Sequence, residues 1–400
     1  MKNILLIMPY GSVGGMERLA LSFYKHYKLK GYKVKALKFI KLDTDIINFD
    51  EDEYYLSEVD FHGMPKLKRL SFYFNAAKRI RRIIKKEEIT HSISFGDMAN
   101  FFSALTLSKD YKIGSIHALK SVEFTSKSLL NSLFKLSYKT SYRYLDKVVS
   151  ISKDIKEDLV KHCGFKFQDK LKVIYNPHNL SEINRLAKEE IDNMQESSLF
   201  TGQTILFLGR LSIQKSPWHL IKAFSIVLKT QPNSNLVFIG DGDPQVEVYL
   251  KNLVDKLGIT DKISFLGRKK NPYKYLAVSK VLALSSHYEG TPNVIVESIC
   301  VGTPIVSSFC TRGITELMSF DNYNEIYENV TMESGIVTPN LFKGQLGIPD
   351  NDNFTIEEEL FAEALTSVLS SNVYKDMLVQ NKSALLSKFD IEKVTEAYLK

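Results

Sequence analysis

The sequence predicts an α/β fold with two doubly wound, parallel-sheet domains. Short, continuous hydrophobic runs alternate with helical stretches along the whole chain, as is typical of strands that are covered on both faces and joined by right-handed crossovers. The chain has 400 residues, which is too long for one ordinary hydrophobic core. A polar stretch over residues 181–202 carries no strand pattern and separates the runs into two sets.

The predicted strands follow the hydrophobic runs in chain order. In the first half they cover residues 3–8, 33–39, 91–95, 111–115, 147–150 and 171–175. In the second half they cover residues 204–208, 235–239, 263–266, 281–284 and 304–307. We therefore expect a first domain over residues 1–180, a linker over 181–202, a second domain over 203–380, and a C-terminal helix over 381–400 that packs back on the first domain.

The composition indicates a cytoplasmic protein. Hydrophobic residues make up 44% and charged residues 25% of the chain, as in ordinary globular proteins. The opening segment, MKNILLIMPYGS, is read as a first strand because its apolar run is too short for a signal peptide. No window approaches the roughly 18 apolar residues of a membrane span. Three cysteines without metal-ligand spacing, Cys163, Cys300 and Cys310, predict unpaired thiols in a reducing compartment.

Positive charge is concentrated in the first half of the chain. Residues 1–180 hold 32 Lys and Arg against 19 Asp and Glu, whereas the remainder holds 21 against 27. Residues 66–86 carry nine basic residues and no acid. The apolar positions at helical spacing in this segment are Leu70, Phe74, Ala77, Ile80 and Ile84. Such a helix fits the surface of an anionic membrane, with a packed helix and a solvated basic face as the alternative. Nucleic acid is not expected, because no nucleic-acid motif accompanies the charge.

Residues that follow strands are the candidates for a binding site, because ligands of open parallel sheets bind beyond the carboxyl ends of the strands. The segment 11–18, GSVGGMER, follows the first predicted strand. Its glycines would let backbone N–H groups approach a phosphate, but a tight turn explains the loop equally well. It does not fit a dinucleotide fingerprint.

Three more turns follow strands of the second half. Arg210 and Lys215 lie five residues apart, and an Arg fork with a Lys point charge suits a diphosphate; an ordinary basic loop is the alternative. The turn GDGD begins at Gly240, and we expect Asp241 to cap the next helix, with a hydrogen bond to a substrate as the alternative. The turn at Arg268 has its backbone placed to meet a base.

The stretch 285–308, SSHYEGTPNVIVESICVGTPIVSS, holds two acids in an apolar segment. Pro292 predicts a helix that begins at Asn293, so Glu289 would lie in the loop before it and Glu297 inside it, roughly 7.5 Å further along the axis. The unpaired N–H groups of the helix start form an anion site over Thr291, Pro292, Asn293 and Val294. The order of acid, anion site and acid complements the sugar, pyrophosphate and ribose of a nucleotide sugar. A capped helix with one charged face is the alternative.

The motifs together resemble one family. GGMER, GRLSIQK, IGDGD, FLGR, EGTPNVIVE and GTPIV, in this order, look like those of the retaining glycosyltransferases of family four. That family has the GT-B fold, in which two Rossmann-like domains face each other across a cleft. The resemblance covers nearly the whole chain. ISFGDMANFFSAL and SIHA are similar to members that build bacterial surface polysaccharides such as capsule and lipopolysaccharide.

The resemblance implies a role for each candidate in the second domain. Glu297 would bind the ribose and Glu289 the donor sugar. Arg210 and Lys215 would neutralise the pyrophosphate.

It also implies roles in the first domain. Gly14 and Gly15 would approach the phosphates or the sugar, and His117 would lie near the donor sugar. The chain departs from the family at His178-Asn179, where a valine and an acid are common, and at Ala118, where Asp or Asn is common.

The implied function is retaining transfer of a hexose or N-acetylhexosamine from a nucleotide sugar, with UDP expected, to a growing surface glycan or a polyprenyl-diphosphate-linked acceptor. Peripheral association with the inner face of the cytoplasmic membrane would explain the basic first half. No cofactor or metal is expected, since Asp241-Gly242-Asp243 has a DxD form but falls in the family's turn. A UDP-sugar 2-epimerase and a non-catalytic nucleotide-sugar-binding subunit are the alternatives.

Overall fold

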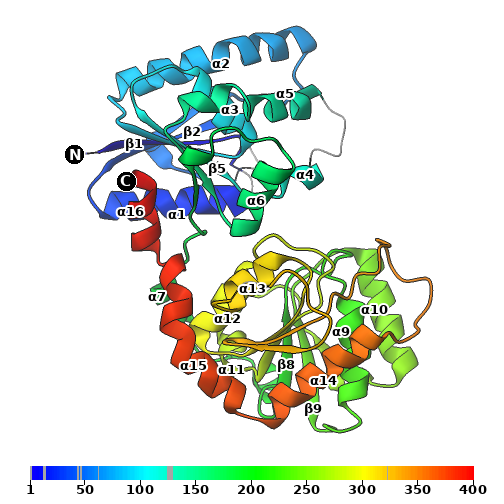
Figure 1. Ribbon diagram of the computed structural model, residues 1–400. Coiled ribbons are helices and arrows are strands. Elements are labelled where there is room, and N and C mark those ends of the chain that lie inside the picture. The colour runs from blue at the N-terminus through cyan, green and yellow to red at the C-terminus, as the bar shows by residue number, and fades with distance from the viewer. Residues whose placement is uncertain are drawn as a thin grey trace. The chain divides into compact units, whose positions relative to one another are not determined.

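The computed structural model describes residues 2–11, 15–42, 45, 47–61, 63–123, 129–321 and 323–400. The chain forms two compact units. The first contains Met1–Pro177 together with Lys388–Lys400, and the second contains His178–Ser387. Each unit is a Rossmann-like α/β domain, and the GT-B architecture expected from the sequence is confirmed at the level of the two units (Figure 1).

The first unit is built on a parallel sheet with the strand order β3-β2-β1-β4-β5-β6-β7. Its strands are β1 (Asn3–Met8), β2 (Lys33–Ile40), β3 (Glu53–Ser57), β4 (His91–Phe95), β5 (Tyr111–Ile116), β6 (Lys147–Ser150) and β7 (Leu171–Val173). Its helices are α1 (Gly15–Leu29), α2 (Lys66–Lys86), α3 (Asp97–Leu105), α4 (Lys120–Glu123), α5 (Leu129–Ser137), α6 (Lys153–Lys161) and α16 (Ile391–Leu399). The sequence did not predict β3, because an edge strand needs little hydrophobic character.

The second unit has the strand order β10-β9-β8-β11-β12-β14-β13. Its strands are β8 (Gln203–Leu208), β9 (Ser234–Ile239), β10 (Ile263–Phe265), β11 (Val281–Leu284), β12 (Ile305–Ser308), β13 (Val330–Met332) and β14 (Gly335–Thr338). Its helices are α7 (Leu180–Leu186), α8 (Met194–Ser198), α9 (Pro217–Val227), α10 (Pro244–Leu257), α11 (Tyr273–Val278), α12 (Asn293–Val301), α13 (Arg312–Met318), α14 (Ile356–Ser370) and α15 (Val373–Leu386). Only β13 pairs antiparallel among the described strands.

Alternate residues of β1 face two different cores. Ile4, Leu6 and Met8 pack with α1 and α16, whereas Leu5 and Ile7 pack with α2 and α3. This two-sided burial is why the strand reads as an unbroken apolar run. Helices consequently cover both faces of the sheet, as Figure 1 shows for α1 and α2.

The expected linker over 181–202 is instead part of the second unit. Asn179 and Asn193 cap α7 and α8, and their side chains accept hydrogen bonds from the first turns of these helices. Ile183 is buried, and α7 packs on α11 and α12. The expected C-terminal helix over 381–400 is divided: α15 ends in the second unit, and α16 packs on α1 in the first.

The basic helix α2 has two apolar faces. Its buried residues are Phe72, Ala76, Ile80 and Ile84. Leu70 and Phe74, predicted to share a face with Ile80, are 53% and 78% exposed, because the contact with the sheet follows residues four apart. Together with Leu67, which is 82% exposed, they form an apolar stripe on the outside of a helix rich in Lys and Arg. No described helix is both long and apolar enough to cross a membrane.

Candidate functional site

Lys215 and Glu289 meet at the carboxyl end of the second sheet. Lys215 follows β8 and Glu289 follows β11, and these two strands are neighbours. The Lys215 ammonium forms an ion pair with Glu289 Oε1, and Ser286 Oγ donates to the same oxygen at 2.7 Å. The side chains are 19% and 8% exposed, respectively. A cation and an anion are therefore held together where ligands of such sheets bind.

The two loops behind this pair are tied to each other by hydrogen bonds. Ser216 Oγ donates to the Ser285 carbonyl at 2.7 Å, and Ser285 Oγ donates to the Ser216 carbonyl at 3.1 Å. The backbone N–H of His287 donates to the Gln214 carbonyl at 2.9 Å. Ser216 has φ 38°, a left-handed conformation that a serine adopts only when its surroundings hold it. The position of Lys215 is therefore set by the loop that carries Glu289.

Helix α12 begins at Asn293, as predicted. Its N-cap, Pro292, offers no side-chain hydrogen bond to the first turn. Pro292 and Val294 are buried, whereas Asn293 is exposed and Thr291 half-buried. The N-terminus of α12 therefore presents backbone N–H groups without a side-chain cap, which suits an anion. Glu297 lies within the helix, and Tyr273 Oη donates to its Oε1 at 3.4 Å.

The glycines of the GDGD turn have a structural reason. A Cβ on Gly240 would lie 1.9 Å from the Gly209 carbonyl oxygen, and one on Gly242 would lie 2.0 Å from that of Leu211. The loops that follow β8 and β9 thus run backbone against backbone, with Gly240 at φ 140°. Close packing of the two loops therefore explains Gly240 without a ligand.

The capping role expected for Asp241 is wrong. Asp243 is the N-cap of α10 and accepts a hydrogen bond from the Gln245 N–H at 2.9 Å. Helix α10 begins two residues later than an Asp241 cap requires, because Pro244 occupies its first position. Asp241 Oδ2 instead lies 3.6 Å from Arg268 Nε, in an exposed pair.

Arg210 is exposed and is not part of the Lys215–Glu289 pair. Its guanidinium forms no hydrogen bond or ion pair with the residues that the structure describes. It lies on the same loop, after β8, and is free to meet an incoming anion.

The first unit places His117 directly after β5. Its Nε2 lies 2.7 Å from Ser115 Oγ, and burial, together with the nearby Lys120 ammonium, lowers the pKa of His117 to about 3. The imidazole is therefore neutral at physiological pH. Gly15 is the first residue of α1, and Gly14 lies outside the described residues. A Cβ on Gly96, after β4, would lie 3.1 Å from Met16 Sδ, so the start of α1 lies beside this turn.

Several buried polar residues near these sites were not predicted. Lys120 Nζ lies 2.7 Å from Asp97 Oδ2, and Tyr138 Oη donates to Asp97 Oδ1 at 2.6 Å. The only sequence signal was the Gly96-Asp97 turn after a strand. In the second unit, Ser286 and His287 precede Glu289 but carry no motif of their own.

The chain is similar to known glycosyltransferases. The chain matches the family Glycosyltransferase Family 4 over residues 13–182 and the family Glycosyl transferases group 1 over residues 190–325. It is 25% identical over 334 residues to an uncharacterized glycosyltransferase of Methanocaldococcus jannaschii, with 80% of each chain covered.

A Campylobacter jejuni relative is similar over its whole length. It is 26% identical in a 410-residue alignment that covers 100% of this chain and 98% of the relative. That protein is named GalNAc-alpha-(1->4)-GalNAc-alpha-(1->3)-diNAcBac-PP-undecaprenol alpha-1,4-N-acetyl-D-galactosaminyltransferase. Among solved structures, HepE of Anabaena in complex with UDP superposes with a TM-score of 0.73 at 18% identity, covering 100% of this chain and 98% of HepE. At this low identity, the similarity to HepE shows a shared fold.

Proposed function

Because the chain belongs to the family 4 glycosyltransferases of the GT-B fold, we propose that it moves a hexose or N-acetylhexosamine from a UDP-sugar to a lipid-linked or growing surface glycan. We further propose that the anomeric configuration is retained and that no metal takes part. UDP in the HepE complex supports the choice of nucleotide. The undecaprenyl-diphosphate acceptor in the name of the Campylobacter relative supports a lipid-linked acceptor.

The observation that carries the proposal is the Lys215–Glu289 pair at the carboxyl edge of the second sheet. Each partner neutralises the other while no donor is bound. A donor would supply a diphosphate for the ammonium and hydroxyl groups for the carboxylate, so both partners would exchange one contact for a better one. We assign the ribose to Glu297 and the pyrophosphate to Lys215, Arg210 and the N-terminus of α12.

In the reaction, an acceptor hydroxyl oxygen bonds to the anomeric carbon as the bond from that carbon to the diphosphate oxygen breaks. The hydroxyl proton passes to the departing phosphate, which leaves UDP and a new glycoside. Negative charge grows on the leaving diphosphate in the transition state, and fixed cations that face it lower the barrier. His117, which is neutral, can share a hydrogen bond with a sugar hydroxyl but adds no charge.

The exposed stripe of α2 supports membrane association of the first unit. Leu67, Leu70 and Phe74 lie on a helix with nine basic residues, so apolar insertion and attraction to anionic lipid would act together. A protein at the membrane surface would meet a polyprenyl-linked acceptor there. Leu136 of α5 is another exposed apolar side chain of this unit.

The test begins with donor binding. UDP-glucose, UDP-galactose, UDP-GlcNAc and UDP-GalNAc are each added to the full chain, and the free energy of unfolding is followed. A donor at about 100 times its dissociation constant adds about 2.7 kcal/mol. UDP release is then measured with and without a lipid-linked glycan.

Each result separates the proposal from its alternatives. We expect rapid UDP release only when both donor and acceptor are present. Conversion of the donor without acceptor would identify an epimerase. Donor binding with no turnover on any acceptor would identify a non-catalytic subunit.

A further inference from the structure

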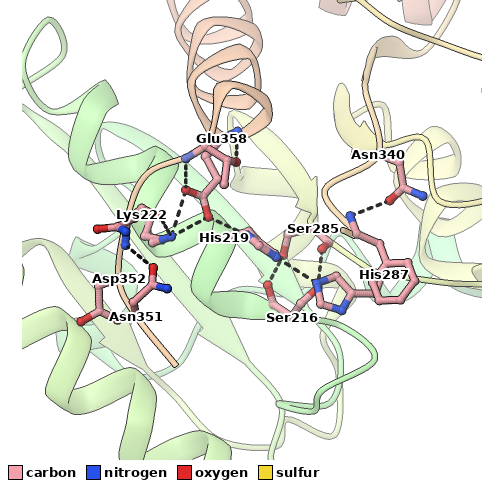
Figure 2. A network of polar contacts seen from close by, with 12 residues as sticks. Ser216, His219, Lys222, Ser285, His287, Asn340, Asn351, Asp352 and Glu358 are labelled. Atoms are coloured by element: carbon pink, nitrogen blue, oxygen red, sulfur yellow. Dashed lines mark hydrogen bonds and ion pairs between the residues drawn. The ribbon is translucent and has the colours of Figure 1, made fainter. Parts of the chain in front are cut away.

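A buried chain of polar contacts joins Glu358, His219 and His287 (Figure 2). It begins at Glu358 in the first turn of α14, passes through His219 of α9, and ends at His287 in the loop after β11. His219 Nδ1 lies 2.6 Å from Glu358 Oε1, and His219 Nε2 lies 2.9 Å from His287 Nε2. The three side chains belong to residues that are at most 8% exposed.

The contacts of Glu358 determine which nitrogen of His219 carries a proton. Lys222 Nζ lies 2.9 and 3.0 Å from the two carboxylate oxygens, and the Thr355 N–H donates to Oε2 at 3.0 Å. Glu358 is thus an ionised acceptor whose charge Lys222 balances. His219 must donate to it from Nδ1.

The contact between the two rings then has one consistent direction. Neutral His219 has a bare Nε2, so His287 must donate from its own Nε2. A further proton on this pair would be a buried positive charge without a partner, since Lys222 already balances Glu358. Burial and the neighbouring His219 lower the pKa of His287 to about 4, in the same direction. This assignment leaves His287 Nδ1 as a bare acceptor, and no described residue hydrogen-bonds to it.

His287 connects this chain to the site. Its backbone N–H donates to Gln214 in the Lys215 loop at 2.9 Å. The preceding residue, Ser286, donates from its hydroxyl to Glu289 Oε1 at 2.7 Å. The His287 ring also packs on Trp218 and Phe342, with centroids 5.7 and 5.1 Å apart, respectively. Packing holds the ring in place, and the hydrogen bond to His219 selects its rotation.

We propose that His219 and His287 are positioning residues. Their hydrogen bonds fix the loop 285–289 relative to Glu358, and this loop in turn holds Glu289 against Lys215 in the geometry required for sugar transfer. The inference rests on the proposed function for its catalytic part. Its structural part, that the hydrogen bond between the two imidazoles orders the loop, stands independently.

The experiment compares two substitutions of His287 with a matched control. His287→Leu removes the donor and keeps an apolar side chain of similar bulk. His287→Gln keeps an N–H donor near the position of Nε2. His162→Gln changes an exposed histidine of the first unit and is the control. His219→Asn is a second route, because its amide nitrogen can still donate to Glu358 but cannot reach His287.

Hydrogen exchange of the backbone amides over 285–291 is the readout that needs no substrate. We expect His287→Leu and His219→Asn to raise the exchange rate there about tenfold or more, His287→Gln to stay near wild type, and His162→Gln to have no effect. Exchange as slow in His287→Leu as in wild type would overturn the proposal. So would equal loosening in His287→Gln and His287→Leu, which would indicate packing alone.

Kinetics test the catalytic part with the UDP-sugar that the donor screen identifies. We expect kcat to fall roughly 10- to 100-fold in His287→Leu, while the KM for that donor stays within about threefold. The reason is that a misplaced Lys215–Glu289 pair stabilises the transition state less well but still binds the donor. His287→Gln should recover most of kcat. The double substitution His219→Asn with His287→Leu should be no worse than His287→Leu alone, because both break one contact.

The two proposals fail in different ways. If no UDP-sugar is turned over by the wild type, the proposed function fails and the exchange measurement still decides whether the two imidazoles order the loop. If the wild type is active and His287→Leu raises KM without lowering kcat, the positioning role is wrong and the proposed function stands.

Discussion

The two units share one architecture but use charge differently. The second unit buries ion pairs, with Lys215–Glu289 next to the strand ends and Lys222–Glu358 between α9 and α14. The first unit also buries ion pairs, such as Lys38–Glu53 and Lys120–Asp97, but most of its excess positive charge lies on the outside of α2. The same fold thus supports a site with fixed charges in one unit and a broad basic surface in the other.

This difference fits the two roles that we propose for the two halves, donor binding in the second and membrane association in the first. A leaving diphosphate is small and needs cations at defined places, which buried pairs and tied loops provide. A lipid surface is large and fluid, so many exposed cations with a few apolar side chains suit it better. The following substitutions distinguish the fixed charges of the second unit from the basic surface of the first.

Lys215→Ala should have the largest effect. It removes a cation from the proposed leaving group and leaves the mostly buried Glu289 with Ser286 as its one hydrogen-bond partner among the described residues. We expect kcat to fall roughly 10³-fold, of the order seen when one preorganised stabilising group is lost. Steady-state UDP release measures it, and Lys229→Ala, on the surface of the same unit, is the control. Activity within tenfold of wild type would remove Lys215 from the site.

Glu289→Gln should come next. The amide keeps the shape of the carboxylate but loses the ion pair with Lys215 and a strong acceptor for sugar hydroxyls. We expect turnover to fall about 100-fold while the melting temperature changes by only a few degrees. Wild-type turnover in this variant would contradict the assignment of the donor sugar to Glu289.

The exposed stripe of α2 should affect membrane binding but not soluble catalysis. Leu67→Asp with Phe74→Asp places two charges where apolar side chains are 82% and 78% exposed. Losing the insertion of two such side chains should weaken binding to phosphatidylglycerol vesicles by roughly 100-fold. Flotation at low salt measures it. Val373→Asp, at a 65% exposed position of the second unit, should float like wild type.

Three histidines with lowered pKa values give a smaller expected effect, on the free energy of unfolding, in both units. Burial lowers the pKa of His117 to about 3 and the pKa values of His178 and His287 to about 4. These values lie below those of the unfolded chain, about 6.5, so protonation favours unfolding. Their contribution is complete above pH 6.5 and is lost as the pH falls toward 4.

Urea unfolding at pH 7.5 and at pH 5 tests this. We expect the free energy of unfolding to fall by about 1.4 kcal/mol per pH unit for each histidine below pH 6.5. His117→Gln should make the slope shallower. Stability that rises between pH 7.5 and pH 5 would show that these imidazoles are not buried in their neutral form.

The sequence predicted the parts of the site that depend on local chemistry. Pro292 and Asn293 specified the start of α12, and Glu289 and Lys215 were found by motif. Their ion pair could not be predicted, because it depends on β8 and β11 being neighbours in the sheet.

Parts that depend on long-range packing were missed for the same reason. His219 lies 68 residues from His287 and 139 from Glu358, and none of the three stands in a recognisable pattern. The cap of α10 was assigned to Asp241 rather than Asp243, since the turn offers two acids and only the backbone decides between them. The expected linker is helical, because Asn179 just before it and Asn193 within it cap α7 and α8.

The most direct test of the central claim, that the second unit holds the nucleotide sugar between Glu289 and Glu297, is a calorimetric titration of UDP, which has no sugar. We expect Glu297→Ala to weaken UDP binding by roughly 10- to 100-fold, because a charged hydrogen-bond acceptor for the ribose is lost. Glu289→Gln should bind UDP within about threefold of wild type. Equal loss in both variants, or loss only in Glu289→Gln, would contradict the assigned order of sugar, pyrophosphate and ribose.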